Sequence, residues 1–294
     1  MSLKLGSDIT SHYYIDYTKY TGAAKITYTY NSVNEREENV PVTETIDLTD
    51  IPAELLEDNR IKLTVSQAPA QIAEPTHIKI LAADETLLGH LDYSAKTYCD
   101  SVTAMSDEAL AAFAGSESEA ARLKTLAHSL IAYAAAAQGV FADYETVKVT
   151  CESEAVKAQI EAATAVPQIT VNNAGQIKFS SVSFVCAKDA RLRLFLNTQG
   201  ATSTPSAPQS DDGTAALKYV MRDGVKTYFV EVSGIDAVDF SKKITVTYGG
   251  SEITLSVLDF CGIVLKDGST ACTAMKHLSK SLIVYYNNAK AYFN

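Results

Sequence analysis

Histidines are the first residues to test for chemistry, because imidazole acts as a general base or metal ligand near neutral pH. The chain has five of them: His12, His77, His90, His128 and His277. None lies in a Gly-x-Ser-x-Gly or a His-Glu-x-x-His sequence, which would indicate a hydrolase nucleophile or a zinc site. His128 is followed by Ser129, but a second copy of its helix, at residues 275–293, carries Lys280 instead. We therefore interpret His128 as a solvent-facing residue.

Paired carboxylates would suit glycoside hydrolysis if a cleft held them about 5 to 10 Å apart. The adjacent pairs Glu57-Asp58 and Asp211-Asp212 lie in hydrophilic turns, where solvation explains them. The segment 211–214 is too short for an EF-hand calcium loop, and no glycine-rich phosphate-binding sequence occurs. The sequence thus predicts no catalytic residue, no cofactor and no metal site, and an enzymatic role would require an unfamiliar site.

Cysteine spacing gives no sign of a metal or redox motif. The five cysteines are Cys99, Cys151, Cys186, Cys261 and Cys272, and no Cys-x-x-Cys pair is present. Domains of this size need no disulfide scaffold. We interpret the cysteines as buried apolar thiols, with a Cys261–Cys272 bridge as the alternative.

Tyrosine is the one residue type whose distribution suggests binding. The chain has sixteen Tyr, nine Phe and no Trp, and Tyr13, Tyr14, Tyr17 and Tyr20 lie close together near its start. A flat apolar ring with a polar tip suits protein interfaces and stacking on sugars, so these four residues are a candidate contact surface. Strands also favour tyrosine for packing alone, so the same residues could simply cover a sheet. The absence of Trp argues mildly against a dedicated carbohydrate platform.

The sequence of one predicted long helix occurs twice in the chain. Residues 123–141, "LKTLAHSLIAYAAAAQGVF", match residues 275–293, "MKHLSKSLIVYYNNAKAYF", at eight of nineteen positions. The identical pairs are Lys124/Lys276, Leu126/Leu278, Ser129/Ser281, Leu130/Leu282, Ile131/Ile283, Tyr133/Tyr285, Ala137/Ala289 and Phe141/Phe293. In each copy apolar residues recur at three- and four-residue spacing, which predicts a helix with one apolar face covering a sheet. Ser116, followed by Glu119, predicts the start of the first copy.

Shorter segments upstream repeat as well. "YSAKTYCDSV" at 93–102 and "LSVLDFCGIV" at 255–264 share Ser94/Ser256, an aromatic pair and Cys99/Cys261. We expect each to be a short helix that packs antiparallel to the long one, giving a helical hairpin at the end of each half.

Strands are predicted before each helical pair. Runs rich in β-branched and aromatic residues occupy 24–33, 42–49, 59–67, 76–83 and 86–94 in the first half, and 175–186, 190–198, 216–235 and 242–258 in the second. Asp223-Gly224 and Gly249-Gly250 interrupt the last two runs, as two-residue hairpin turns do. Strands segregated from helices indicate an α+β fold, with a β-sandwich-like assembly in each half.

The length of the chain indicates the number of domains, and its charge limits the kinds of partner. Its 294 residues suit two domains, which we place at 1–145 and 146–294, with a boundary within 144–154. A helix is expected over 153–164, and a long mobile loop over 197–216. The net charge of −10 and the lack of a basic run argue against a nucleic-acid partner. No apolar stretch reaches the roughly 20 residues of a membrane span, and no secretory signal is visible.

The repeated segments resemble a known module. Large secreted or cell-surface proteins of gut clostridia carry tandem modules with a Tyr-Ser-Val-Lys-x-Tyr segment followed by a long helix, and residues 93–102 and 123–141 are similar to that pattern. The matching positions are Tyr93, Ser94, Lys96, Tyr98, Leu123, Lys124, Leu130, Tyr133, Ala135, Ala137, Gln138 and Phe141. The second copy diverges more and reads Val284-Tyr285-Tyr286 where the module has Asn-Tyr-Gly. The resemblance covers the last third of each half and implies a secreted or cell-surface location. These modules have no assigned activity, so no catalytic residue carries over.

Three functions remain open at this stage. We expect a non-enzymatic extracellular structural or adhesion module that contacts an unspecified protein or glycan at the cell surface. The first alternative is a carbohydrate-binding accessory module that uses exposed tyrosines. The second is an enzyme with an unrecognised site.

Overall fold

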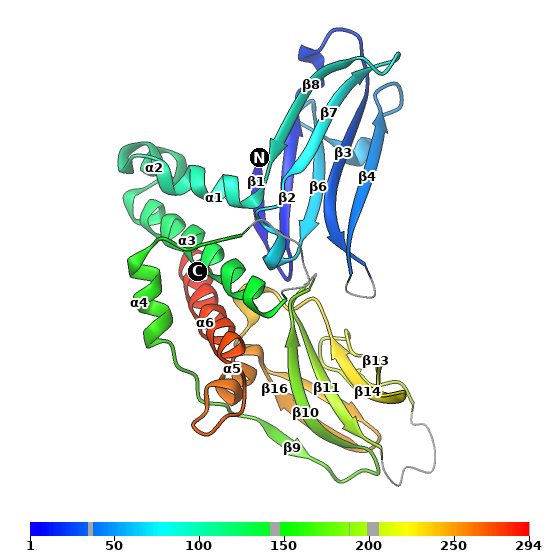
Figure 1. Cartoon of the computed structure of the whole chain (residues 1–294), viewed down its shortest axis with the longest axis vertical. Coiled ribbons are helices and arrows are strands. Elements are labelled where there is room, and N and C mark those ends of the chain that lie inside the picture. Colours follow the sequence, from blue (N-terminus) through cyan, green and yellow to red (C-terminus); the bar gives the residue numbers. More distant parts are fainter. Residues whose placement is uncertain (35–37, 142–147, 188, 199–205, 294) are drawn as a thin grey trace.

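The computed structural model of the chain describes residues 1–34, 38–141, 148–187, 189–198 and 206–293. These residues form four antiparallel four-stranded sheets and six α-helices, so the predicted α+β class is confirmed. The helices gather along one side of the molecule, with the sheets of the first half at one end and those of the second half at the other (Figure 1). No helix in the described ranges combines the length and apolar character needed to cross a membrane.

The first half contains two sheets that face each other. The β2 sheet has the order β1 (Ser2–Leu5), β2 (Ile9–Ile15), β6 (Arg60–Gln67) and β5 (Leu56–Glu57). The β3 sheet has the order β4 (Asn39–Asp47), β3 (Ala23–Val33), β7 (Thr76–Ala82) and β8 (Leu87–Tyr93). Every second residue of β6 is buried, as expected for a strand with one face on a core. Isoleucines from both sheets meet there, for example Ile61 with Ile26 and Ile78.

The second half also has two sheets. The β14 sheet has the order β10 (Lys178–Val185), β11 (Arg191–Asn197), β14 (Val225–Val232) and β13 (Ala216–Arg222). The β16 sheet has the order β12 (Gln209–Ser210), β15 (Ile244–Tyr248), β16 (Ser251–Leu255) and β9 (Thr170–Asn172). Both predicted hairpin turns are confirmed: φ is 50° and 76° at Asp223 and Gly224, and 60° and 80° at Gly249 and Gly250. Positive φ at both central residues is the type I′ requirement.

Serine side chains cap the starts of most of the helices. The helices are α1 (Ala95–Ala104), α2 (Asp107–Ala114), α3 (Glu117–Val140), α4 (Glu154–Ala162), α5 (Val257–Leu265) and α6 (Thr273–Phe293), with 3-10 turns at Tyr17–Lys19, Ala53–Leu55, Pro69–Gln71 and Ala237–Asp239. The predicted start of α3 is confirmed, because the Ser116 hydroxyl accepts a hydrogen bond from the Glu119 amide at 3.2 Å. Ser94 and Ser256, the repeated serines, cap α1 and α5 in the same way.

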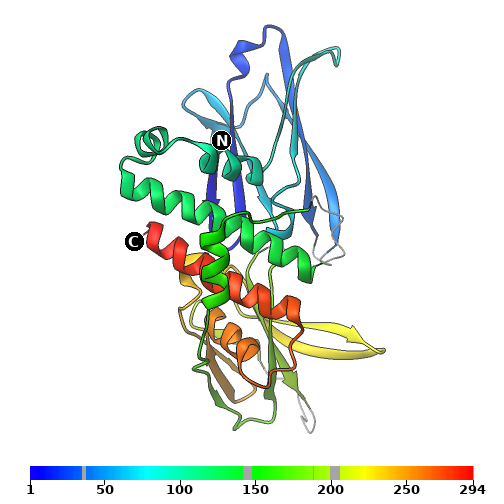
Figure 2. The ribbon, with the colours of Figure 1, turned by 60° about the vertical axis from the view of Figure 1, so that its left-hand side comes forward.

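The two copies of the long helix pack against each other. In both views α3 and α6 run side by side through the middle of the molecule (Figures 1 and 2). The rings of Tyr133 and Tyr285, which occupy the same position in the repeat, stack with centroids 5.1 Å apart. We expected each long helix to cover the sheet of its own half. This expectation was wrong, because each long helix packs mainly against the other long helix. One apolar core joins the helices of both halves to the sheets of the second half, whereas the two sheets of the first half enclose a second core of their own.

Helix α3 does not have the single apolar face that its spacing predicted. Buried residues occur all around its second half, including Ala132, Ala134 and Ala136 as well as Leu130. A helix apolar on all sides is one buried on all sides, and α3 contacts α1, α2, α4 and α6. The final aromatic residues of the two copies are not buried as the predicted apolar face required: Phe141 is half-buried and Phe293 is 53% exposed.

Other expectations have mixed outcomes. The helix expected at 153–164 is α4. Residues 142–147, at the expected boundary, and 199–205, in the expected mobile loop, lie outside the described residues. All five cysteines are free, and Cys261 is buried while Cys272 is exposed, so a Cys261–Cys272 bridge is ruled out. Four of the five are buried thiols, as expected.

Candidate functional site

The four tyrosines predicted as a contact surface do not share one. Tyr13, on β2, is 1% exposed, and its hydroxyl is hydrogen-bonded with Thr76 Oγ1 and with the Tyr93 carbonyl oxygen, both at 3.0 Å. Tyr13 is therefore a core residue that joins β2 to the β3 sheet, and its place on an exposed surface was wrong. The alternation along β2 explains this, because Tyr13 falls on the buried face with Ser11 and Ile15.

Tyr17 and Tyr20 are half-buried and pack at the margin of the same core. The ring of Tyr20 covers Gly89 so closely that a Cβ atom at Gly89 would lie 2.4 Å from Tyr20 Cε1. This contact gives Tyr20 a structural role in holding β8. Tyr14 points the other way from Tyr13, and Arg60 lies 5.2 Å from the centroid of its ring. The contact role of Tyr14, Tyr17 and Tyr20 stays a prediction.

A hollow beside Tyr14 is the best candidate for a binding site, and we call it the aromatic groove. It lies where β2 and β8 meet α1 and α2, and its volume is about 330 Å³. That volume falls within the range of about 300 to 1,000 Å³ typical of ligand sites. Its lining residues are Met1, Tyr13, Tyr14, Ile15, Leu91, Tyr93, Tyr98, Ser101, Val102, Met105 and Phe113.

The side chains that line the aromatic groove are of uncharged and largely apolar types. Burial raises the pKa of Tyr98, with smaller contributions from Cys99, Tyr292 and Tyr93. The Tyr93 hydroxyl already lies 3.3 Å from Ser101 Oγ. The groove therefore offers rings and aliphatic groups more readily than free hydrogen-bonding groups.

Large apolar side chains at the rim of the aromatic groove are open to water. Leu91 is 41% exposed and Phe113 is 58% exposed. Single exposed apolar residues are common, but these two line the same hollow, and exposed apolar groups gathered at one site mark interaction surfaces.

The aromatic groove belongs to the first half alone. Tyr98 corresponds in the repeat to Phe260, which is 4% exposed and stacks on Phe184 with centroids 5.9 Å apart. Tyr98 instead is half-buried and lines the groove. At this position of the repeat, the second half has a buried core residue, Phe260, whereas the first half has Tyr98, which lines the groove.

A larger hollow of about 630 Å³ lies between α2, α3 and α4. Its acidic side chains, among them Asp107 and Glu117, sit in the first turns of α2 and α3, where the helix dipole favours them. His128 is half-buried and lines the wall of this hollow. Burial and then the charge of Lys124 lower the pKa of His128, so the imidazole is neutral at pH 7.

The remaining sites considered from the sequence have local partners. Glu57 forms an ion pair with Lys62 at 2.8 Å, and Asp212 accepts hydrogen bonds from Thr214. His77 lies 2.8 Å from the Asp92 carboxylate on an exposed part of the β3 sheet. In the described ranges no group of three or more His, Cys, Asp or Glu side chains is placed to hold a metal ion.

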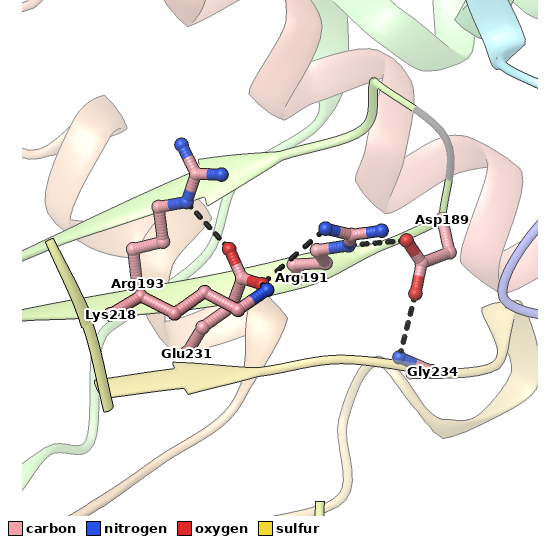
Figure 3. Close-up of polar contacts among 6 residues, drawn as sticks. All are labelled: Asp189, Arg191, Arg193, Lys218, Glu231 and Gly234. Carbon is pink, nitrogen blue, oxygen red and sulfur yellow. Dashed lines mark hydrogen bonds and ion pairs between the residues drawn. The ribbon is translucent and has the colours of Figure 1, made fainter. Parts of the chain in front are cut away.

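A buried charge cluster in the second half was not foreseen from the sequence. Glu231, on β14, is 2% exposed and lies 2.7 Å from Arg193 Nε, 2.6 Å from Lys218 Nζ and 3.3 Å from an Arg191 guanidinium nitrogen (Figure 3). Asp189 binds Arg191 and accepts a hydrogen bond from the Gly234 amide at 3.1 Å. Only the strand register brings these residues together, because Arg193 pairs across the ladder with Glu231.

Comparisons with known proteins give no relative for this chain: no protein-family model, no curated protein and no solved structure matches it.

Proposed function

We propose that this chain is a non-enzymatic binding module of the structural or adhesion class, and that the aromatic groove holds an apolar segment of a partner protein. The observation that carries the proposal is the concave, uncharged lining of the groove beneath the exposed rim residues Leu91 and Phe113. Association through such a surface gains free energy from apolar area removed from water, at about 25 cal/mol per Å².

A carbohydrate ligand is the second candidate, because several tyrosines, among them Tyr14, Tyr93 and Tyr98, line one hollow. Sugar recognition also needs polar groups that bind the hydroxyls. The hydroxyls of Tyr93 and Tyr14 instead have protein partners, Ser101 and Ser2, at 3.3 and 3.4 Å. The rim is aliphatic and phenyl rather than polar. These features favour an apolar protein segment over a glycan.

We also infer that the chain is a tandem of two modules, 1–145 and 146–294, built on one plan. In each half, a final strand leads through a capping serine into a short helix and then reaches the long helix. The halves differ in α2, which separates α1 from α3 and has no counterpart between α5 and α6. The stacked pair Tyr133 and Tyr285 supports a two-fold relation between the modules, because equivalent residues meet at the axis of such a pair.

Each of these two tyrosines is influenced by thiols of the other half. Burial is the largest cause of the raised pKa of both; Cys186 and Cys261, of the second half, contribute to that of Tyr133, and Cys99, of the first half, contributes to that of Tyr285. Each long helix thus brings its tyrosine near buried thiols of the other half. This exchange favours a chain that folds as one unit rather than as two independent beads.

The proposed location is secreted or cell-surface, and the resemblance of residues 93–102 and 123–141 to clostridial surface modules supports it. Detection of the native protein by antibody on intact cells or in culture medium tests this directly. Confinement to the cytosolic fraction would contradict it.

The binding proposal is tested with a phage-displayed random dodecapeptide library and, in parallel, a glycan array with titration of plant polysaccharides. We expect selected peptides rich in aromatic, Leu and Met residues, and no glycan binding at millimolar concentration. Leu91→Ser with Phe113→Ser should weaken peptide binding at least about tenfold. Met221→Ser with Val225→Ser, which removes two comparably exposed apolar side chains elsewhere, is the matched control and should bind normally.

A further inference from the structure

Strand β13 and the start of β14 form an exposed part of the second half. It projects from the body of the molecule (Figure 2). Four of its large apolar side chains are open to water: Tyr219 is 51% exposed, Val220 39%, Met221 54% and Val225 66%. No function described above uses these residues.

Strand β13 is also a free sheet edge. It is the last strand in the order β10-β11-β14-β13, and among the described strands it pairs only with β14. A row of backbone N–H and C=O groups along its outer side is therefore open to another strand. Proteins that bind extended peptides by adding a strand use an edge of this kind.

The two faces of the β13 edge differ in chemistry. Lys218 and Arg222 lie on one face, since residues two apart along a strand share a side, and Tyr219 and Met221 lie on the other. The Arg222 guanidinium stands 4.8 Å above the ring of Phe195, which keeps it on the sheet surface. An incoming strand would therefore meet cations on one side and apolar groups on the other.

The net charge of the hairpin is opposite in sign to that of the chain. Residues 216–232 contain three cations, Lys218, Arg222 and Lys226, and two carboxylates, Asp223 and Glu231, whereas the whole chain carries −10. Lys218 is paired with Glu231 but stays 49% exposed, so it can also meet a carboxylate from outside. Self-pairing of two copies centred on Val220 would place Lys218 opposite Arg222, and like charges directly opposite are destabilising. The edge thus disfavours a second copy and favours an acidic strand.

From these observations we propose that the outer edge of β13 binds an extended acidic segment of a partner protein, in which acidic and apolar residues alternate. The segment adds as a fifth strand to the β14 sheet. Its carboxylates face Lys218 and Arg222, and its apolar side chains lie beside Tyr219 and Met221. This site is separate from the aromatic groove, which lies wholly in the first half.

The test uses the full chain and a fluorescein-labelled heptapeptide of alternating Glu and Val, with fluorescence polarisation as the readout. A peptide of the same composition with its Glu and Val residues in two blocks is the control for alternation. We expect the alternating peptide to bind at least about tenfold more tightly, and its binding to weaken between about 0.05 and 0.3 M salt because exposed charges are screened.

Two further arms separate strand addition from simple charge attraction. An added strand forms hydrogen bonds to its neighbour through only every second backbone N–H group. Two methylated peptides test this, one N-methylated at every Glu and the other at every Val. We expect one of these two peptides to lose binding and the other to keep it. Lys218→Gln with Arg222→Gln should weaken binding about fivefold or more. Lys79→Gln with Lys242→Gln, an equal loss of charge at exposed positions, should leave it within about twofold.

Three outcomes would overturn the proposal. The first is equal binding of the alternating and block peptides. The second is stronger binding of a sulfated oligosaccharide, lost in Lys218→Gln with Arg222→Gln, which would identify a polyanion surface instead. The third is a concentration-dependent dimer in sedimentation that Met221→Ser with Val225→Ser abolishes, which would identify a second copy as the occupant.

Discussion

The buried carboxylate Glu231 should contribute strongly to the stability of the second half. Glu231→Gln keeps the shape of the side chain but removes the charge that three cations surround (Figure 3). Loss of one partner from a fully buried ion pair costs about 3 to 5 kcal/mol. Here Lys218 is 49% exposed and Arg191 keeps Asp189 as a partner, so the loss of the Glu231 charge disturbs only part of the cluster. We expect a loss of about 2 to 3 kcal/mol, below that range.

Urea unfolding followed by circular dichroism measures this loss. With a slope of about 3 kcal/mol per M, the midpoint should fall by roughly 0.7 to 1 M. Glu252→Gln, the same change on an exposed position of β16, is the control and should shift the midpoint little. A Glu231→Gln chain within about 0.5 kcal/mol of the parent would refute the reasoning, because that is the range of an ordinary surface substitution.

The pH dependence of the same effect has a definite sign. Burial alone would raise the pKa of Glu231, but hydrogen bonds and charges from Lys218 and Arg193 outweigh it and lower the pKa below its ordinary value of 4.5. A carboxyl group whose pKa is lower in the folded state stabilises the fold above the unfolded pKa and loses that contribution as the pH falls through the folded pKa. The difference between the parent and Glu231→Gln should therefore be full at pH 7 and shrink below pH 4.5.

Three further predictions concern packing. Tyr133→Ala removes a ring stacked on Tyr285 and should lower the free energy of unfolding by about 3 to 5 kcal/mol, with both halves melting in one calorimetric transition. Gly175→Ala places a Cβ atom 2.0 Å from the Gly249 carbonyl oxygen, and calorimetry should show a destabilisation of about 2 to 3 kcal/mol. In the native chain a thiol reagent should modify Cys272 rapidly and the four buried cysteines only after unfolding, since burial raises the pKa of three of them to about 12.

Each of these has a clear contrary result. Two separate transitions in Tyr133→Ala and in the parent would show independent halves. A Gly175→Ala chain as stable as the parent would show that the backbone contact with Gly249 can relax. Rapid modification of more than one thiol in the native chain would place another cysteine at the surface.

Local sequence signals predicted the secondary structure well. Asp223-Gly224 and Gly249-Gly250 have few alternatives to a type I′ turn, and Ser116 before Glu119 marks a helix start because its side chain satisfies a free amide. These features depend on residues within a few positions of each other, so one sequence is enough to find them.

Features that depend on tertiary register were missed. Tyr13 and Tyr14 look equivalent in sequence, and only the side of β2 that faces the core decides that Tyr13 is buried. The aromatic groove needed α1 and α2 to be placed over β8, although its members Tyr93 and Tyr98 lay in a segment already singled out by the repeat. The Glu231 cluster joins residues of three strands, and periodicity within one strand carries no information on such pairing.

The central claim is that the aromatic groove binds an apolar peptide segment, and isothermal titration calorimetry with one library-selected apolar peptide tests it most directly. The peptide is titrated into the parent chain, into Leu91→Ser with Phe113→Ser, and into Met221→Ser with Val225→Ser. Binding through the aromatic groove predicts a loss of at least about tenfold in the first variant only, with a negative heat-capacity change from apolar burial. Equal affinity for the parent and the Leu91→Ser with Phe113→Ser chain would contradict the account.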